Sequence, residues 1–174
     1  ISYIVLRTIE GISRPAMTAY FPTMKGKTAM LDLGANIECD SKNLIDFSLM
    51  GSAFSRIILK CSNPSVGILN VGEESQKGNS IIQDASATLN NLKDKINYFG
   101  FVEGNDIAEG NVDVIVTDGF SGNIALKTAE GTAKLVTFLL EKSFKSSIFS
   151  KIGYLLSKNG LKNMKDRVDP RKYN

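Results

Sequence analysis

Three short polar segments carry the residue types that could do chemistry, and each follows a run of apolar residues. The first is Gly34-Ala35-Asn36, which follows the run 28–33. The second is 72–79, ending in Lys77-Gly78-Asn79, and the third is 118–123, with the sequence Asp-Gly-Phe-Ser-Gly-Asn. Each combines small residues, which let the backbone bend, with amide or charged groups that could bind an anion.

The second segment invites comparison with the phosphate-binding loop of nucleotide hydrolases. A Walker A motif requires Gly-Lys-Ser/Thr, whereas here Lys77 precedes Gly78 and Asn79, so that type of loop is excluded. A glycine-bearing loop that enters a helix still offers unpaired N–H groups and a favourable dipole to an anion, and Lys77 adds a charge. The alternative is that Glu73 and Glu74 simply pair with Lys77 at the surface.

In the third segment, Gly119 and Gly122 allow a tight turn before a helix. Asn123 lies four residues before Lys127, so a helix would place both side chains on one face. Asp118 could orient a lysine, or it could only cap the helix. The segment has no G-x-G-x-x-G pattern, so it gives no support to a dinucleotide cofactor.

The chain contains no histidine, and this limits the chemistry that it can carry. Ser-His-Asp and Cys-His nucleophile pairs and histidine-ligated zinc are excluded within the chain, which leaves Lys, Asn, Asp, Glu and backbone groups. Cys39 and Cys61 lack metal-ligand spacing and are expected to be free thiols in a reducing, cytoplasmic setting. We therefore expect no metal and no cofactor. Asn36 could also serve only its own turn.

The elements that must position these segments alternate between strands and helices. Strands are expected at 28–33, 66–71, 98–102 and 112–117, and helices from Asp40 or Ser41 to Asn63, over 80–95 and over 124–145. This alternation predicts an α/β domain with three α/β/α layers and a mostly parallel sheet. Ligands of such sheets bind at the carboxyl ends of the strands, where the three polar segments are expected to meet.

Composition and charge predict two regions in the chain. The 174 residues are 43% hydrophobic and 22% charged, as in a globular domain, and no apolar run is long enough to span a bilayer. Residues 1–141 hold 12 Lys and Arg against 16 Asp and Glu, a net charge of −4, whereas residues 142–174 hold 9 against 2, a net charge of +7. The opening run lacks the features of a signal peptide, so we expect the chain to begin inside a longer protein.

The basic region 142–174 also has an amphipathic pattern. Its apolar face consists of Phe144, Ile148, Phe149, Ile152, Leu155 and Leu156, and its later basic residues are Lys158, Lys162, Lys165, Arg167, Arg171 and Lys172. This pattern is typical of a helix that lies on a membrane surface. Packing on the same protein or on a dimer partner explains the apolar face equally well. Nucleic-acid binding is not favoured, because no aromatic and basic interleaving accompanies the charge.

Taken together and in order, several strings resemble the phosphate acyltransferases of bacterial phospholipid synthesis. They are Gly11-Ile-Ser-Arg-Pro-Ala16, Leu31-Asp-Leu-Gly-Ala-Asn36, Met50-Gly51-Ser52, Val66-Gly-Ile-Leu-Asn-Val-Gly-Glu-Glu-Ser75 with Lys77-Gly-Asn79, Val102-Glu-Gly104, and Asp118-Gly-Phe-Ser-Gly-Asn123 with Leu126-Lys127 and Glu130-Gly131. The similarity covers about Gly11 to Lys127 and continues more loosely through the basic region. Each string is modest alone, but the ordered set is specific.

The resemblance implies a homodimeric α/β/α enzyme whose fold is similar to the phosphotransacetylases and the isocitrate dehydrogenases. Such an enzyme transfers a fatty acyl group from acyl-acyl carrier protein to orthophosphate, giving acyl phosphate, and associates peripherally with the inner face of the plasma membrane. The family is about twice this length, so its N-terminal and extreme C-terminal parts are expected to be absent here. Catalysis by this chain alone is therefore not expected.

Transfer from a thioester to phosphate agrees with the lack of histidine, because orthophosphate is already anionic near neutral pH. We expect a catalytic set of Asn36, Lys77, Asp118, Asn123 and Lys127, and a phosphate- or substrate-binding set of Gly34, Gly78, Asn79, Gly119 and Gly122. The lysines would bind the anion, the asparagine amides would donate hydrogen bonds, and the aspartate would orient them. A non-catalytic, membrane-peripheral dimerisation module is the alternative function, and a dehydrogenase of similar fold is disfavoured.

Overall fold

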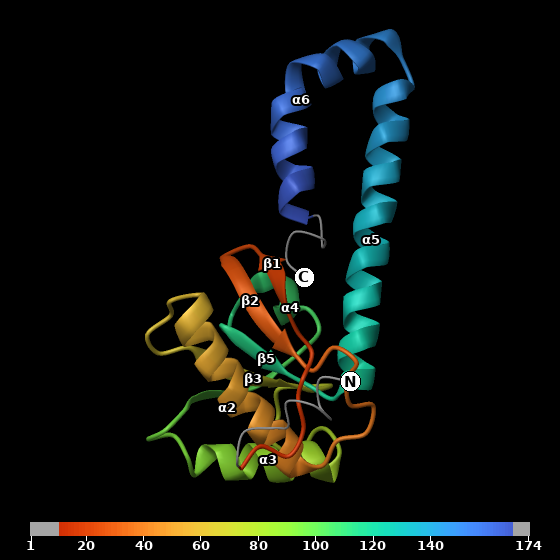
Figure 1. Cartoon of the computed structure of the whole chain (residues 1–174). Helices are drawn as coiled ribbons and strands as arrows, with labels where there is room; N and C mark the ends of the chain where they lie inside the picture. The colour runs from red at the N-terminus through yellow and green to blue at the C-terminus, as the bar shows by residue number, and fades with distance from the viewer. Residues whose placement is uncertain (1–10, 169–174) are drawn as a thin grey trace, which may run out of the picture. The chain divides into compact units, whose positions relative to one another are not determined.

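The computed structural model describes residues 11–168 of the chain, with side chains described for residues 11–164 (Figure 1). The chain forms two compact units, Ile1–Ile124 and Ala125–Asn174. The division expected from charge, between residues 141 and 142, falls inside one long helix instead.

The described part of the first unit, residues 11–124, contains one five-stranded sheet. Its strands are β1 (Thr18–Thr23), β2 (Gly26–Leu31), β3 (Ser65–Leu69), β4 (Asn97–Val102) and β5 (Val114–Val116), and its helices are α2 (Ser41–Ile58), α3 (Ser80–Asn90) and the short α4 (Asp106–Glu109). The strand order is β1-β2-β5-β3-β4. Strands β2, β5, β3 and β4 run parallel, and only β1 is antiparallel to its neighbour. The predicted α/β fold with a mostly parallel sheet is confirmed.

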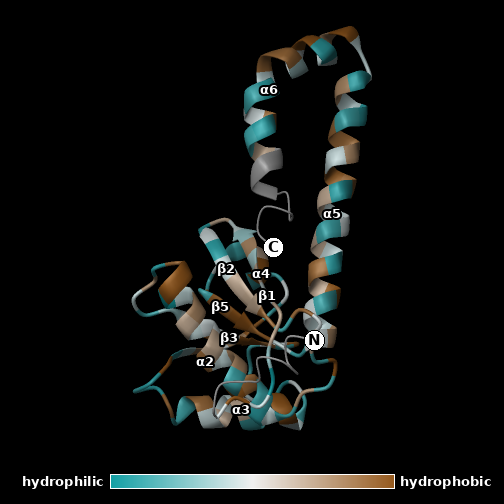
Figure 2. Cartoon of the chain, in the orientation of Figure 1, coloured by the Kyte–Doolittle hydropathy of each residue, from teal (hydrophilic) through white to brown (hydrophobic). Residues whose placement is uncertain are grey.

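The core of the first unit lies between the sheet and the helices α2 and α3 (Figure 1). Alternate residues of the central strands point to these helices, as the twofold period of a strand requires. The strands contribute Ala29, Leu31, Val66, Ile68, Val114 and Val116, and the helices contribute Leu44, Phe47, Ala85 and Leu89. Figure 2 shows β3 and β5 as largely hydrophobic ribbon, as expected for parallel strands buried on both faces, whereas β2 begins with hydrophilic residues.

Helix α2 begins with a complete capping box. Asp40 accepts a hydrogen bond from the backbone N–H of Asn43 at 2.7 Å, and the side chain of Asn43 accepts one from the backbone of Asp40 at 3.1 Å. Two donors at the helix start are thereby satisfied. The predicted start of this helix is confirmed, and the helix ends at Ile58, before the predicted stop at Asn63-Pro64.

Sequence reasoning missed strand β1, which pairs with β2 in a hairpin. Its sequence contains Pro22, which cannot donate a hydrogen bond to a neighbouring strand. The strand lies at the edge of the sheet, the position at which proline is tolerated.

The second unit contains most of α5 (Gly119–Lys145) and all of α6 (Ile148–Val168). The predicted continuous amphipathic segment is interrupted between the helices, because Ser147 begins α6 by accepting a 3.1 Å hydrogen bond from the backbone N–H of Ser150. Phe144 therefore belongs to α5, and the other predicted apolar residues belong to α6. The side chains of Lys165 and Arg167, and all of Arg171 and Lys172, lie outside the described residues.

Candidate active site

The three predicted polar segments follow neighbouring strands of the first unit. The segment containing Gly34-Ala35-Asn36 follows β2, the segment 118–123 follows β5, and the segment 72–79 follows β3. Because β2, β5 and β3 are adjacent and parallel, all three segments emerge at one edge of the sheet. The predicted convergence at this edge is confirmed.

Asp32 organises the first of these segments, although sequence reasoning gave it no role. The side chain is fully buried and accepts hydrogen bonds from the backbone N–H groups of Met17, Gly34, Ala35 and Asn36, at 2.7 to 3.2 Å. A buried carboxylate requires such partners, since an unpaired buried charge is costly. The signal in the sequence is a lone acidic residue at the end of an apolar strand.

Asn36 is held in the same network. Its amide nitrogen donates to Asp32 Oδ2 and to the carbonyl of Pro15, both at 2.7 Å. Its own backbone carbonyl accepts a 2.8 Å hydrogen bond from the N–H of Gly119. Both amide hydrogens of Asn36 are thus engaged with the protein, so the contacts show a role in joining segments, and donation to a substrate stays a prediction.

Gly119 and Gly122 allow the first turn of α5 to lie directly against the loop after β2. A Cβ added to Gly119 would lie 2.5 Å from the carbonyl oxygen of Asn36, and one added to Gly122 would lie 1.9 Å from that of Asp32. Both glycines are buried in this contact. The two glycines thus permit the close approach of two backbone segments. Their contact with a substrate stays a prediction.

The start of α5 is capped by Asp118. Its two carboxylate oxygens accept hydrogen bonds from the backbone N–H and the hydroxyl of Ser121, at 2.8 and 2.9 Å. Of the two roles predicted for Asp118, the structure therefore shows the helix cap. Asn123 donates a 3.1 Å hydrogen bond to the carbonyl of Leu33 and lies against Gly34, whose φ of 132° suits glycine.

The loop after β3 is held by Asn70, another residue that sequence reasoning missed. Asn70 is buried and donates to the carbonyls of Gly72 and Lys77, at 3.0 and 3.1 Å. A Cβ at Gly78 would collide with the Asn70 side chain, at 2.3 Å from its Oδ1 atom, and Gly78 has a φ of 86°. Asn79 then caps α3 by accepting from the N–H of Ile82. The loop thus turns tightly into a helix N-terminus.

Lys77 and Lys127, the two predicted anion-binding lysines, are in different surroundings. The Lys77 side chain is exposed, and within the side chains that the structure describes it forms no ion pair with Glu73 or Glu74. The surface-pair alternative for Lys77 is therefore not observed. Lys127 lies in the second unit and pairs with Glu130 at 3.1 Å.

A pocket of about 370 Å³ opens among the loops of the first unit. Its lining consists of Ile37, Glu38, Cys39, Leu44, Asn79, Ile81, Ile82 and Asp118. Burial raises the pKa of the Cys39 thiol; Asp118 and Asp32 raise it further, while the Gly119 N–H and Arg14 lower it. The thiol is therefore kept in its neutral form, and the pocket combines apolar walls with a helix N-terminus at Asn79.

The whole chain, residues 1–174, matches the family described as fatty acid synthesis protein. The chain belongs to this family. It is 56% identical to the phosphate acyltransferase of Rhodospirillum centenum, over 98% of this chain and 48% of that protein. It is 52% identical to the phosphate acyltransferase of Paramagnetospirillum magneticum, over the whole chain and 50% of that protein. The chain thus spans about half the length of these curated relatives.

Two solved structures share the fold of this member of the fatty acid synthesis protein family. The EutD phosphotransacetylase from Staphylococcus aureus gives a TM-score of 0.61 at 17% identity and covers 76% of this chain and 46% of that chain. A phosphotransacetylase from Streptococcus pyogenes gives a TM-score of 0.58 at 16% identity, covering 74% and 44%. At these identities the likeness shows the fold alone, and it agrees with the fold that the sequence predicted.

Across the described part of the chain, no helix has the length and apolar character needed to cross a bilayer. Several large apolar side chains are nevertheless exposed on α5 and α6. The most exposed of the predicted membrane-contact residues are Phe149 and Leu156, at 83% and 84%, with Ile148, Ile152 and Leu155 also exposed and Phe144 half-buried. Along both helices polar and apolar residues alternate (Figure 2).

Proposed function

We propose that the protein containing this chain is a phosphate acyltransferase, which transfers a fatty acyl group from acyl-acyl carrier protein to orthophosphate. The single observation that carries this proposal is the identity of 56% and 52%, over essentially the whole chain, to proteins named phosphate acyltransferase. The phosphotransacetylase-like fold supports it, since those enzymes by name also join an acyl group to phosphate.

In the proposed reaction a phosphate oxygen attacks the thioester carbonyl carbon. The new C–O bond forms, the C–S bond breaks, and the thiolate that leaves the carrier takes up a proton. Phosphate is already anionic at neutral pH, so the protein needs to bind and align it more than to deprotonate it. The sequence offers no histidine for such a deprotonation, and the absence agrees with this requirement.

The loops after β2, β5 and β3 would supply the groups that bind and align the phosphate. The N-terminus of α3 at Asn79 presents backbone N–H groups and the positive end of the helix dipole. Lys77 adds an exposed charge beside that helix start. Lys127 and Asn123 are the proposed contribution of α5, and Asp32 holds the loops rather than contacting the substrate.

Single substitutions in the full-length protein test these roles. Lys77→Ala and Lys127→Ala are expected to reduce phosphate-dependent acyl transfer by about tenfold or more each, because each removes one charge-assisted contact. Lys93→Ala is the matched control, since Lys93 is exposed and follows α3, near the amino end of β4 and away from the site edge. Rates equal to wild type in both test variants would remove the lysines from the proposed site.

We also propose that the helices α5 and α6 bind an anionic membrane surface through their exposed apolar residues. The alternative is that the same residues form a homodimer interface. The supporting observations are the exposed Phe149 and Leu156 and the net charge of +7 over residues 142–174. Phe149→Asp with Leu156→Asp should abolish flotation with anionic vesicles. If the double variant instead floats normally and changes only the molar mass in solution, the residues form a dimer interface.

The non-catalytic alternative, a membrane-peripheral dimerisation module, makes a distinct prediction. It requires vesicle binding or dimerisation by a full-length protein that shows no phosphate-dependent acyl transfer. A transfer assay on the same preparation that is used for flotation therefore separates the two functions.

A further inference from the structure

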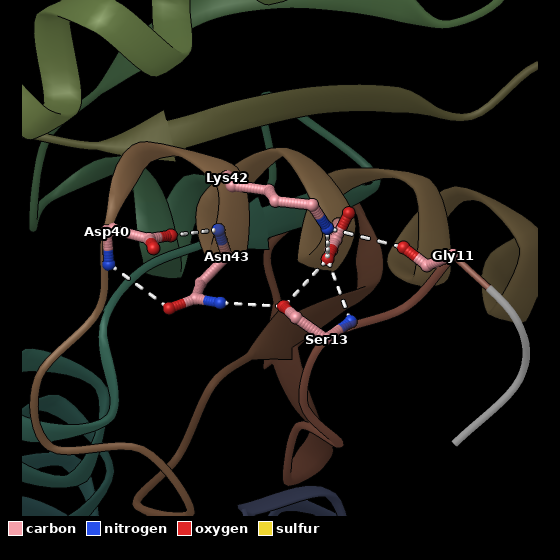
Figure 3. Close-up of polar contacts among 6 residues, drawn as sticks. Gly11, Ser13, Asp40, Lys42 and Asn43 are labelled. Carbon is pink, nitrogen blue, oxygen red and sulfur yellow. Dashed lines mark hydrogen bonds and ion pairs between the residues drawn. The ribbon is translucent and has the colours of Figure 1, made fainter.

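The segment Gly11–Ala16 is a resemblance string that the proposed mechanism does not use, and hydrogen bonds anchor it to α2. Asp46 Oδ2 accepts hydrogen bonds from the backbone N–H and the hydroxyl of Ser13, at 3.1 and 2.9 Å. Asn43 donates to the same hydroxyl at 2.8 Å, and Lys42 bridges Asp46 and the carbonyl of Gly11 (Figure 3). The segment is therefore fixed immediately before Arg14.

A second anchor holds the chain immediately after Arg14. The carbonyl of Pro15 accepts the 2.7 Å hydrogen bond from the Asn36 amide, and the backbone N–H of Met17 donates to Asp32 at 2.8 Å. These contacts join the segment to the loop after β2. The backbone of Arg14 thus lies between two fixed points, one on α2 and one at the site edge of the sheet.

The Arg14 side chain lies beside the pocket. Its Nη1 atom donates a 3.1 Å hydrogen bond to the backbone carbonyl of Glu38, and Glu38 and Cys39 line the pocket. The side chain is exposed to solvent.

Arg14 has no carboxylate to neutralise it among the side chains that the structure describes, where the ion pairs are Lys42–Asp46 and Lys127–Glu130. A guanidinium has five N–H donors, and the one bond to the Glu38 carbonyl leaves donors free for a ligand. The acidic groups beside the pocket, Glu38 and Asp118, would repel an anion. A bound phosphate therefore needs a fixed cation at this edge.

We propose that Arg14 binds a phosphate group of the substrates at the rim of this pocket. The inference rests on the proposed acyl transfer to phosphate and deepens it by naming a residue outside the predicted catalytic and binding sets. Two sources share the chemistry: orthophosphate, and the phosphate ester of the arm on which the carrier bears its acyl group. Arginine suits either one, because its planar fork can bind two phosphate oxygens at once.

The test uses the full-length protein with Arg14→Ala, Arg14→Gln and Arg14→Lys. The first two should raise the KM for one phosphate-bearing substrate by about 10- to 100-fold, the size expected for lost charge-assisted hydrogen bonds. Arg14→Lys should recover only part of the loss, since lysine keeps the charge but not the fork. A rise confined to orthophosphate identifies that source, and a rise confined to the acyl carrier identifies the arm.

Arg56→Ala is the matched control. Arg56 is an exposed arginine in the last turn of α2, at the opposite end of that helix from the site, and both KM values should stay at the wild-type level. A second readout needs no turnover: orthophosphate, or the free carrier arm, should raise the melting temperature of wild type and Arg56→Ala but not of Arg14→Gln.

Together, the KM values and the melting temperatures distinguish a failure of the Arg14 phosphate site from a failure of the proposed acyl transfer. One possible result is that the wild-type protein shows no acyl transfer, while phosphate raises its melting temperature but not that of Arg14→Gln. This result would support the phosphate site and reject the proposed function. An active wild type whose two KM values and ligand-dependent melting temperatures are all unchanged in Arg14→Ala and Arg14→Gln would overturn the inference while leaving the function intact.

Discussion

Replacing Gly122 with alanine tests the close contact on which the geometry of the site depends. The added Cβ would lie 1.9 Å from the carbonyl oxygen of Asp32 and 2.9 Å from Cγ2 of Thr117. Both atoms belong to residues that directly follow a strand at the site edge, and the nearer one is a backbone atom, which cannot rotate away. The first turn of α5 and the loop after β2 must therefore separate by about 1.5 Å to reach an ordinary contact.

The expected cost follows from three contributions. Overpacking against backbone should cost about 3 kcal/mol, the upper end of the usual range. Disturbing the hydrogen bonds of Asp32 should cost about 1 kcal/mol more. The better helix propensity of alanine returns about 1 kcal/mol, so we expect a net loss of about 3 kcal/mol in the free energy of unfolding.

Gly131→Ala in the same helix is the control, because nothing lies within 4 Å of a Cβ at that position. It should stabilise the protein by about 0.5 to 1 kcal/mol. Melting temperatures and acyl-transfer rates of both full-length variants form the assay. Gly122→Ala should melt several degrees below wild type. Its acyl-transfer rate should fall by about 100-fold, because a displacement of even about 1 Å can lower a catalytic rate by that factor. Equal melting temperatures for the two variants would refute the reasoning.

Other substitutions test the supports of the first unit. Tyr98→Phe should cost about 1 kcal/mol, measured by urea unfolding, because the buried hydroxyl loses a 2.8 Å hydrogen bond to a serine of α3. Asp40→Ala should cost about 1 kcal/mol by the same measurement, because it removes the cap of α2. Burial alone would raise the pKa of Asp46, but hydrogen bonds from Lys42 and Ser13 outweigh it and lower that pKa below its ordinary value. The folded state therefore gains stability from ionised Asp46 above about pH 4 and loses it as the pH falls below that value. Melting curves of Asp46→Asn should accordingly lie below wild type at pH 7 and approach it near pH 3; a gap that does not narrow on acidification would contradict this assignment.

The repeated pattern of apolar run, polar loop and helix was sufficient to predict the four parallel strands and the edge at which the site loops meet. Periodicity reports which residues are buried, and burial largely decides these elements. It could not report contacts between distant segments. Nothing near Asp32 in the sequence indicates that the backbone N–H of Met17 will donate to its carboxylate.

The start of α5 shows how a tertiary contact overrides local preference. The sequence predicted a helix from about Ile124, because two glycines and a serine precede it and glycine is a poor helix former. The helix begins at Gly119 instead, since Asp118 caps it and the glycines let it lie against the neighbouring loop. The glycines that weakened the prediction are thus the residues that the contact requires.

The interruption between α5 and α6 could have been found from the sequence. Ser146 and Ser147 stand immediately before the apolar residues of α6, and serine is a preferred residue at a helix start. The regular spacing of apolar residues on both sides hid this signal, because the amphipathic pattern continues across the break.

The most direct test of the proposed function is phosphate-dependent acyl transfer by the full-length protein. Acyl-acyl carrier protein would be incubated with the protein while the phosphate concentration is varied, and both free carrier thiol and acyl phosphate would be measured. We expect the two products to appear in equal amounts and the formation of both to saturate with phosphate. Thiol release that is independent of phosphate, or the absence of acyl phosphate, would contradict the proposed function.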